Sequence, residues 1–195
     1  MILPVIAYGD SVLRKVGINI DKDYPNLEEL IKNMKETMIS AQGVGLAAPQ
    51  IGKAIRLFIV DTSPFAEDNE LEDEERAFLK DFKKVFINAK IIKEEGDEWP
   101  FTEGCLSIPD IREDVFRQEK VTIEYVDENF EKHTDVLDGL AARVVQHEYD
   151  HIEGILFTDK ISSLKKRLIK KKLENISKGK INPDYRMKFP QLKKK

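Results

Sequence analysis

Apolar residues recur at helical spacing in three stretches of the chain. The first covers residues 26–41, where five apolar side chains share one face: Leu27, Leu30, Ile31, Met34 and Met38. This period predicts an amphipathic helix with Asn26 at its N-cap. Residues 161–177 predict a second amphipathic helix, whose polar face is basic. Residues 138–154 are apolar around most of the helix circumference, so we expect this third helix to be buried.

Shorter apolar runs predict a β-sheet. Residues 55–60 predict a buried strand, and residues 84–93 predict another. Residues 120–127 and 130–137 have strand character, and the turn residues between them predict a hairpin. The glycine- and proline-containing stretch 42–52 is expected to be a shaped loop.

An acidic stretch follows the first predicted strand. Seven of the nine residues from 67 to 75 are Asp or Glu, which favours solvent over burial. We therefore expect residues 63–82 to form an acidic surface insertion, with a short helix over 72–82.

Charge is unevenly distributed along the 195 residues, a length that suits one hydrophobic core. The net charge is −4, yet residues 165–195 hold 13 Lys and Arg against two acidic residues, which leaves 19 basic and 34 acidic residues in 1–164. A basic C-terminal segment favours an anionic partner such as nucleic acid. A solvated helix with a frayed terminus accounts for the same composition.

The sequence carries no sign of a membrane segment. No apolar run approaches the ~20 residues that a spanning helix requires. The start of the chain has no basic region and meets Asp10 early, unlike a signal peptide. We therefore expect a cytoplasmic protein with no membrane partner.

The candidate chemistry lies in the third predicted helix, in the sequence QHEYDHIEG. His147 and His151 are four residues apart, so both imidazoles lie on one helix face, with Glu148 beside the first. This HExxH pattern is typical of metal sites in which a carboxylate takes a proton from bound water. Two surface histidines that flank an acidic residue are the alternative.

A catalytic metal site of this kind requires a third protein ligand. A third histidine six residues beyond the second is absent, because Phe157 stands there. Glu174 is a candidate set among lysines. The single cysteine, Cys105, cannot form an internal disulfide and on its own is most simply a small buried apolar residue. Beside an incomplete two-histidine site we favour it as the third ligand.

Three motifs resemble those of peptide deformylases and occur in the same order. They are GVGLAAPQIG at 43–52, EGCLS at 103–107 and QHEYDHIEG at 146–154. The sequence AYGDSVLRKVG at 7–17 is also similar to the start of that family. The resemblance spans residues 5–160.

The resemblance implies an α+β fold in which antiparallel sheets pack around a central helix that carries the HExxH motif, with a helix at the C-terminus. Residues 1–164 would form a single catalytic domain, and residues 165–195 a basic helix and tail. It also implies a hydrolase of protein biosynthesis, which removes the N-formyl group from the formyl-methionine of nascent polypeptides and releases formate.

The same resemblance implies the roles of individual residues. The metal ligands would be Cys105, His147 and His151, with water as fourth ligand and nucleophile. Glu148 would be the general base and acid. Three further residues would stabilise the oxyanion or shape the wall beside it: Gln50, the backbone N–H of Leu106, and Gly45.

The substrate contacts follow from the same motifs. Arg112 matches a family position near the peptide-binding groove. Leu140 and Val144 lie seven and three residues before His147 on the same helix face, so they are expected to line a pocket for the methionine side chain. Val44, in the first motif, is assigned to the same pocket. Plain core packing is the alternative for Leu140 and Val144.

One divalent metal ion is expected, and its identity is open. The family is associated with Fe²⁺ in the cell, whereas a thiolate with two imidazoles also suits Zn²⁺. Zn²⁺, Ni²⁺ or Co²⁺ would be able to occupy the site in purified protein. The basic tail resembles an extension with which some bacterial deformylases dock on the ribosome, and we expect no DNA partner.

Two other functions fit parts of the sequence. A general HExxH metallopeptidase would use Glu174 as third ligand and would not need Cys105. A non-enzymatic RNA-associated protein would bind no metal at all.

Overall fold

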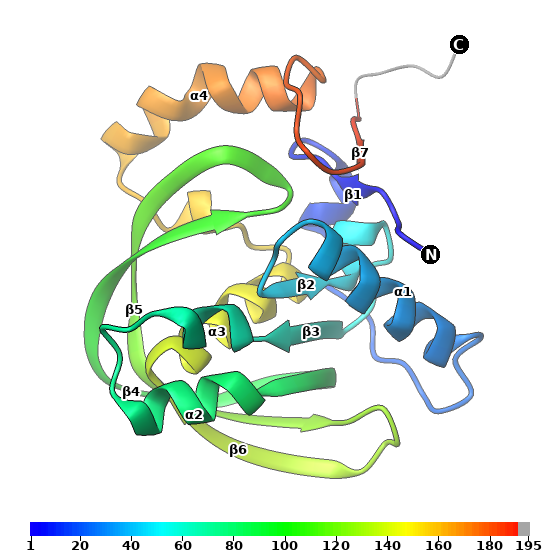
Figure 1. The fold of residues 1–195 in the computed structure, drawn as a ribbon. Helices are drawn as coiled ribbons and strands as arrows, with labels where there is room; N and C mark the ends of the chain where they lie inside the picture. The colour runs from blue at the N-terminus through cyan, green and yellow to red at the C-terminus, as the bar shows by residue number, and fades with distance from the viewer. Residues whose placement is uncertain (191–195) are drawn as a thin grey trace.

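The computed structural model of the chain describes residues 1–190 and is drawn in Figure 1. A five-stranded antiparallel sheet has the order β2-β3-β4-β5-β6, and β1 pairs with β7 in a small parallel sheet. The strands are β1 (Val5–Ile6), β2 (Gly45–Ala47), β3 (Leu57–Asp61), β4 (Lys83–Cys105), β5 (Ile108–Val126), β6 (Lys132–Asp138) and β7 (Met187–Lys188). The helices are α1 (Leu27–Ser40), α2 (Asp73–Asp81), α3 (Gly139–Ile152) and α4 (Ser163–Ser177). The predicted α+β class with an antiparallel sheet is confirmed.

The three long helices lie where the apolar period places them. Asn26 and Asp138 occupy the N-cap positions of α1 and α3, but neither side chain caps its helix. Ser162 does cap α4, where its hydroxyl accepts a hydrogen bond from the backbone N–H of Lys165. None of the helices within residues 1–190 is long and apolar enough to cross a membrane.

The central feature of the fold is a long ribbon of β4 and β5 that curves around α3 (Figure 1). Both strands are far longer than the predicted 84–93 and 120–127. Their register shifts at four places between Ile87 and Cys105, and such bulges bend a ribbon. The outer part of β4 is largely exposed and acidic, so it lacks the alternation that predicts a strand. The predicted hairpin is present as β5 and β6.

Helix α3 is buried between the sheet and the ribbon, as the sequence predicts. Eleven of its 14 residues are buried. Its apolar residues, such as Val145, pack in one core cluster with Phe58 and Phe86, whose rings stack at 4.7 Å between centroids. The polar residues of α3 are therefore also forced into the interior, where they need partners.

The acidic insertion is anchored in this core. Helix α2 occupies the helix predicted over 72–82, and most of its acidic residues are exposed. The segment is nevertheless more than a surface insertion, because two of its apolar side chains are buried. Leu79 and Phe82 are only 1% and 4% exposed and pack in the cluster of Phe58 and Val145. Thr62 fastens the segment, since its hydroxyl donates to the carbonyl of Leu79 at 2.7 Å.

The C-terminal segment also packs on the body of the protein. Ile169 and Leu173 of α4 lie in a second cluster together with Leu13. After α4 the sequence predicts lysine-rich coil, whereas residues 187–188 form β7 beside β1. The end of that predicted coil, residues 191–195, lies outside the described residues.

The burial of α2 yields a stability prediction. We expect Leu79→Ala to lower the free energy of unfolding by about 2–5 kcal/mol, because it leaves a cavity in the main core. Lys80→Ala, an exposed neighbour on the same helix, should change it by less than about 0.5 kcal/mol. Chemical denaturation measures both, and equal effects would show that α2 is not anchored through Leu79.

Candidate functional site

The fold brings three candidate metal ligands together from two elements: one thiol sulfur from β4 and two imidazole nitrogens from α3. Cys105 ends β4 at the tip of the β4–β5 ribbon, where it pairs with Ile108 across a two-residue turn. His147 and His151 project from α3, one turn apart. One ligand atom of each lies within 4.8 Å of the others, and Cys105 Sγ is 3.3 Å from His151 Nε2.

This donor set fits a divalent cation. A thiolate and two imidazoles in one cluster are the ligands that zinc and related metals take, with a fourth position left for water. Glu174 does not join them, because it lies on α4, is half exposed and pairs with Lys178. The three residues favoured by the sequence are thus the three that meet.

A buried carboxylate stands behind His147. Glu103 is 4% exposed, and its Oε2 lies 2.8 Å from His147 Nδ1, so the Nε2 edge of His147 is left free for a ligand. Arg117 donates to the same carboxylate through Nε at 2.6 Å and Nη2 at 2.9 Å. Burial would raise the pKa of Glu103, but the hydrogen bonds from Arg117 and His147 hold it well below its usual range.

The charges continue beyond Glu103. Arg117 also donates to Asp150 of α3 at 2.6 Å, and Arg143 of α3 donates to Glu103 at 3.3 Å and to the carbonyl of Trp99 at 2.6 Å. The sequence alone does not predict this network. Its only signal there is a pair of charged residues, Arg143 and Asp150, on the buried face of an otherwise apolar helix.

The two histidines have opposite electrostatic settings. Burial disfavours a charged imidazole, yet contacts with Cys105 and Glu103 raise the pKa of His147. Burial, reinforced by the positive charge of His147, lowers the pKa of His151. A cation that binds both requires them neutral and so competes with the proton on His147.

Glu148 is buried against a glycine. It is 4% exposed, and burial raises its pKa to about 7. Among residues 1–190 its Oε2 has no hydrogen-bond partner. A Cβ at Gly45 would lie 2.7 Å from the carboxyl carbon of Glu148, so only glycine leaves room for this carboxylate.

Gln50 is held in a defined orientation. Its Oε1 accepts the backbone N–H of Ala47 at 2.8 Å, and its Nε2 points at Cys105 Sγ at 3.4 Å. The side chain is 1% exposed. Leu106 follows Cys105 in the ribbon turn and lines the same pocket as Gln50.

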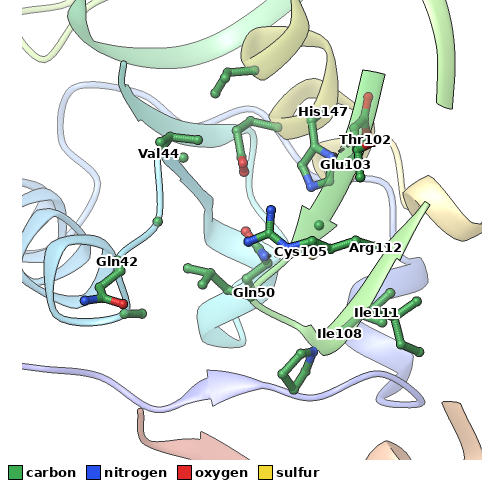
Figure 2. Close-up of a pocket in the computed structure, with 18 of the residues that line it drawn as sticks. Gln42, Val44, Gln50, Thr102, Glu103, Cys105, Ile108, Ile111, Arg112 and His147 are labelled. Carbon is green, nitrogen blue, oxygen red and sulfur yellow. Dashed lines mark hydrogen bonds and ion pairs between the residues drawn. The ribbon is translucent and has the colours of Figure 1, made fainter. Parts of the chain in front are cut away.

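Most of the groups around the donor cluster line one pocket of about 560 Å³ (Figure 2), namely Gly45, Gln50, Glu103, Cys105, Leu106, His147 and Glu148. Val44, Val144 and Arg112 line it, as the sequence predicts. Leu140 does not. It lies at a separate hollow beside α2, because seven residues carry it about 10 Å along the axis of α3, beyond the pocket. Leu140 also packs against the main core cluster, which is the alternative that the sequence leaves open for it.

Several lining residues were not predicted. Pro64 and Phe65 come from the acidic insertion, and the Phe65 ring meets Phe101 edge-on at 6.4 Å between centroids. Tyr185 comes from the segment after α4. No local pattern marks these residues, because each reaches the pocket only through the tertiary fold.

Comparison with known proteins agrees with this geometry. Residues 2–167 match the family model of polypeptide deformylase. The chain is 68% identical over 194 residues to a peptide deformylase of Christiangramia forsetii (100% of this chain and 99% of that protein). It is 66% identical over 194 residues to one of Flavobacterium johnsoniae, again covering 100% and 99%.

Solved structures extend the comparison. A peptide deformylase from Legionella pneumophila superposes with a TM-score of 0.77 at 34% identity, covering 92% of this chain and 98% of that one. One from Plasmodium falciparum gives 0.76 at 31% identity, covering 90% and 95%. The resemblance carried by the three sequence motifs is therefore confirmed, and the chain belongs to the polypeptide deformylase family.

Proposed function

We propose that the chain removes the formyl group from the formyl-methionine of nascent polypeptides at a metal held by Cys105, His147 and His151. The observation that carries this proposal is that the three ligands lie together and that two of them, Cys105 and His147, line one pocket with Glu148 and Gln50. Hydrolysis adds water to the formyl carbon, breaks its bond to nitrogen, and gives formate and a free amine.

One divalent ion supplies the electrophilic part of this chemistry, because a bound cation lowers the pKa of water and polarises a carbonyl. We assign Fe²⁺ as the ion in the cell, with Zn²⁺, Ni²⁺ or Co²⁺ able to take the same donor set. The family as a whole is metal-dependent.

Glu148 is the residue that moves the proton. In its ionised form the carboxylate accepts a proton from the attacking water and later donates it to the departing amine nitrogen. Burial is the largest cause of the rise of its pKa to about 7, and the positive charge of a nearby cation favours the ionised form at neutral pH.

Gln50 and Leu106 stabilise the oxygen that becomes negative in the transition state. The bond from Ala47 fixes the Gln50 amide, so its Nε2 can donate together with the backbone N–H of Leu106. Gly45 contributes by leaving space for Glu148 beside them.

The substrate binds along the same pocket. Val44 and Val144 offer an apolar wall to the methionine side chain. Arg112 is exposed at the edge of the pocket, where its guanidinium can donate to carbonyl groups of the peptide backbone.

Two substitutions separate the proposed roles. Cys105→Ala removes a ligand, so we expect loss of both bound metal and formate release. Glu148→Gln keeps the ligands but cannot accept a proton, so we expect retained metal and formate release lowered by about 10²–10⁴-fold. Anaerobically purified protein, assayed on a short formyl-Met peptide alongside metal analysis, measures both.

Glu153→Gln is the matched control, because Glu153 lies at the end of the same helix and pairs with Arg56 away from the pocket. It should leave formate release unchanged. Full metal in Cys105→Ala, or cleavage of the peptide chain without formate, would favour a general metallopeptidase instead.

Glu103 provides a second test. We expect Glu103→Gln to lower metal affinity about 10–100-fold, because the carboxylate that orients and polarises His147 becomes neutral. Glu113→Gln is the control: it faces Glu103 across the ribbon but pairs with Lys165 near the surface. Competition with a chelator measures both affinities, and equal values would contradict the role of Glu103.

We also propose that α4 docks on the ribosome and that the enzyme acts in the cytoplasm, where nascent chains emerge. Five cations of α4 are exposed, and three of them are Arg167, Lys170 and Lys171. Such a surface suits RNA, because contacts with phosphates supply most of the affinity.

Charge reversal at these three residues should weaken co-sedimentation with ribosomes while sparing formate release from short peptides. The control reverses three other exposed lysines: Lys22, Lys32 and Lys53. Both variants change the net charge equally, so equal loss of binding at matched salt would contradict docking through α4.

A further inference from the structure

The segment after α4 reaches into the catalytic pocket. Tyr185 lines the pocket, and its hydroxyl donates a hydrogen bond to the backbone carbonyl of Leu106 at 2.7 Å. Tyr185 lies beyond residues 2–167, the part of the chain that matches the family model. A residue outside the matched region thus contacts Leu106, the neighbour of the proposed metal ligand Cys105.

The stretch 5–8, which begins with β1, holds both partners of this contact. On one side, the N–H of Val5 donates to the carbonyl of Arg186 at 2.9 Å, directly beside Tyr185. On the other side, the N–H of Tyr8 donates to the carbonyl of Ser107 at 2.9 Å, directly beside Leu106. Tyr185 and the ribbon turn are therefore both fastened to the same short stretch of chain.

Apolar packing strengthens this arrangement. Met187 and Phe189 pack against the cluster that contains Ile108, and Cys105 packs against the same cluster. Tyr185 thus lies two residues before an anchored strand, β7. Because the backbone next to Tyr185 is anchored, its side chain can fix the geometry of the group that it contacts.

The group whose orientation matters is the backbone of Leu106. It occupies a two-residue turn between Cys105 and Ile108, and its carbonyl and N–H are related only by its own φ and ψ. A hydrogen bond to the carbonyl restrains that rotation. An oxyanion donor is effective only when it is aimed at the developing charge before the reaction begins.

We propose that Tyr185 is a positioning residue, which holds the ribbon turn so that the Leu106 N–H faces the formyl oxygen. The inference rests on the proposed function, because it assumes that Leu106 donates to that oxygen. On this inference the C-terminal segment contributes to catalysis by orienting an active-site group.

The test is Tyr185→Phe in the full-length metal-loaded enzyme, which keeps the ring and removes the hydroxyl. We expect kcat on a formyl-Met peptide to fall about three- to tenfold, with KM and metal content unchanged. Hydrogen exchange in the peptide that contains residues 104–108 should become faster, because the turn is less restrained.

Tyr125→Phe is the matched control. Its hydroxyl donates to Asp135 at 2.9 Å in the β5–β6 hairpin, outside the pocket, so the variant loses a similar bond without touching Leu106. It should keep both kcat and the exchange of residues 104–108.

Three results would overturn the inference while wild-type enzyme releases formate: an unchanged kcat in Tyr185→Phe, a raised KM with unchanged kcat, or an equal fall of kcat in Tyr125→Phe. Absence of formate release by the metal-loaded wild type would instead overturn the proposed function, and the exchange measurement would still report on the turn.

Discussion

A single buried carboxylate, Glu103, ties the sheet of this protein to its central helix. It receives hydrogen bonds from Arg117 on β5 and from Arg143 on α3, and it contacts His147 of the same helix. A charge buried without partners would be costly, and breaking such a pair by removing one member typically costs about 3–5 kcal/mol. The curved ribbon therefore has one strongly favoured position relative to α3, and that position sets the distance between Cys105 and the histidines.

The chemistry follows from this constraint because one helix presents several groups in different directions. His147 is oriented by Glu103 through Nδ1, which directs Nε2 toward the ligand position. Glu148 is the next residue, about 100° around the helix, and so faces Gly45 on β2 instead. His151 returns to the first face one turn later. The surrounding sheet thus supplies a different neighbour for each of the three motif residues: Glu103 for His147, Gly45 for Glu148 and Cys105 for His151.

Much of this arrangement could be predicted from the sequence, and the limits are physical. Helices and the paired histidines depend on local periodicity, so α1, α3 and α4 and the shared face of His147 and His151 follow from spacing alone. The length of β4 and β5 does not, because exposed ribbon residues carry no alternation and the bulges have no sequence signal. Leu140 shows a subtler limit, since periodicity gives the face of a helix but not where a pocket ends along its axis.

The remaining features are those made by contacts distant in the chain. Phe65 reaches the pocket because Leu79 fixes the insertion in the core, and Tyr185 reaches it because β7 pairs with β1. Neither residue could be recognised from its neighbours, since each lies in a segment whose composition indicates only solvent exposure. Burial of a few apolar residues decides the position of both segments, and the charged residues around them hide that signal. A charged segment beside an enzyme core is therefore better judged by its apolar residues than by its net charge, because the apolar residues determine which side chains reach the active site.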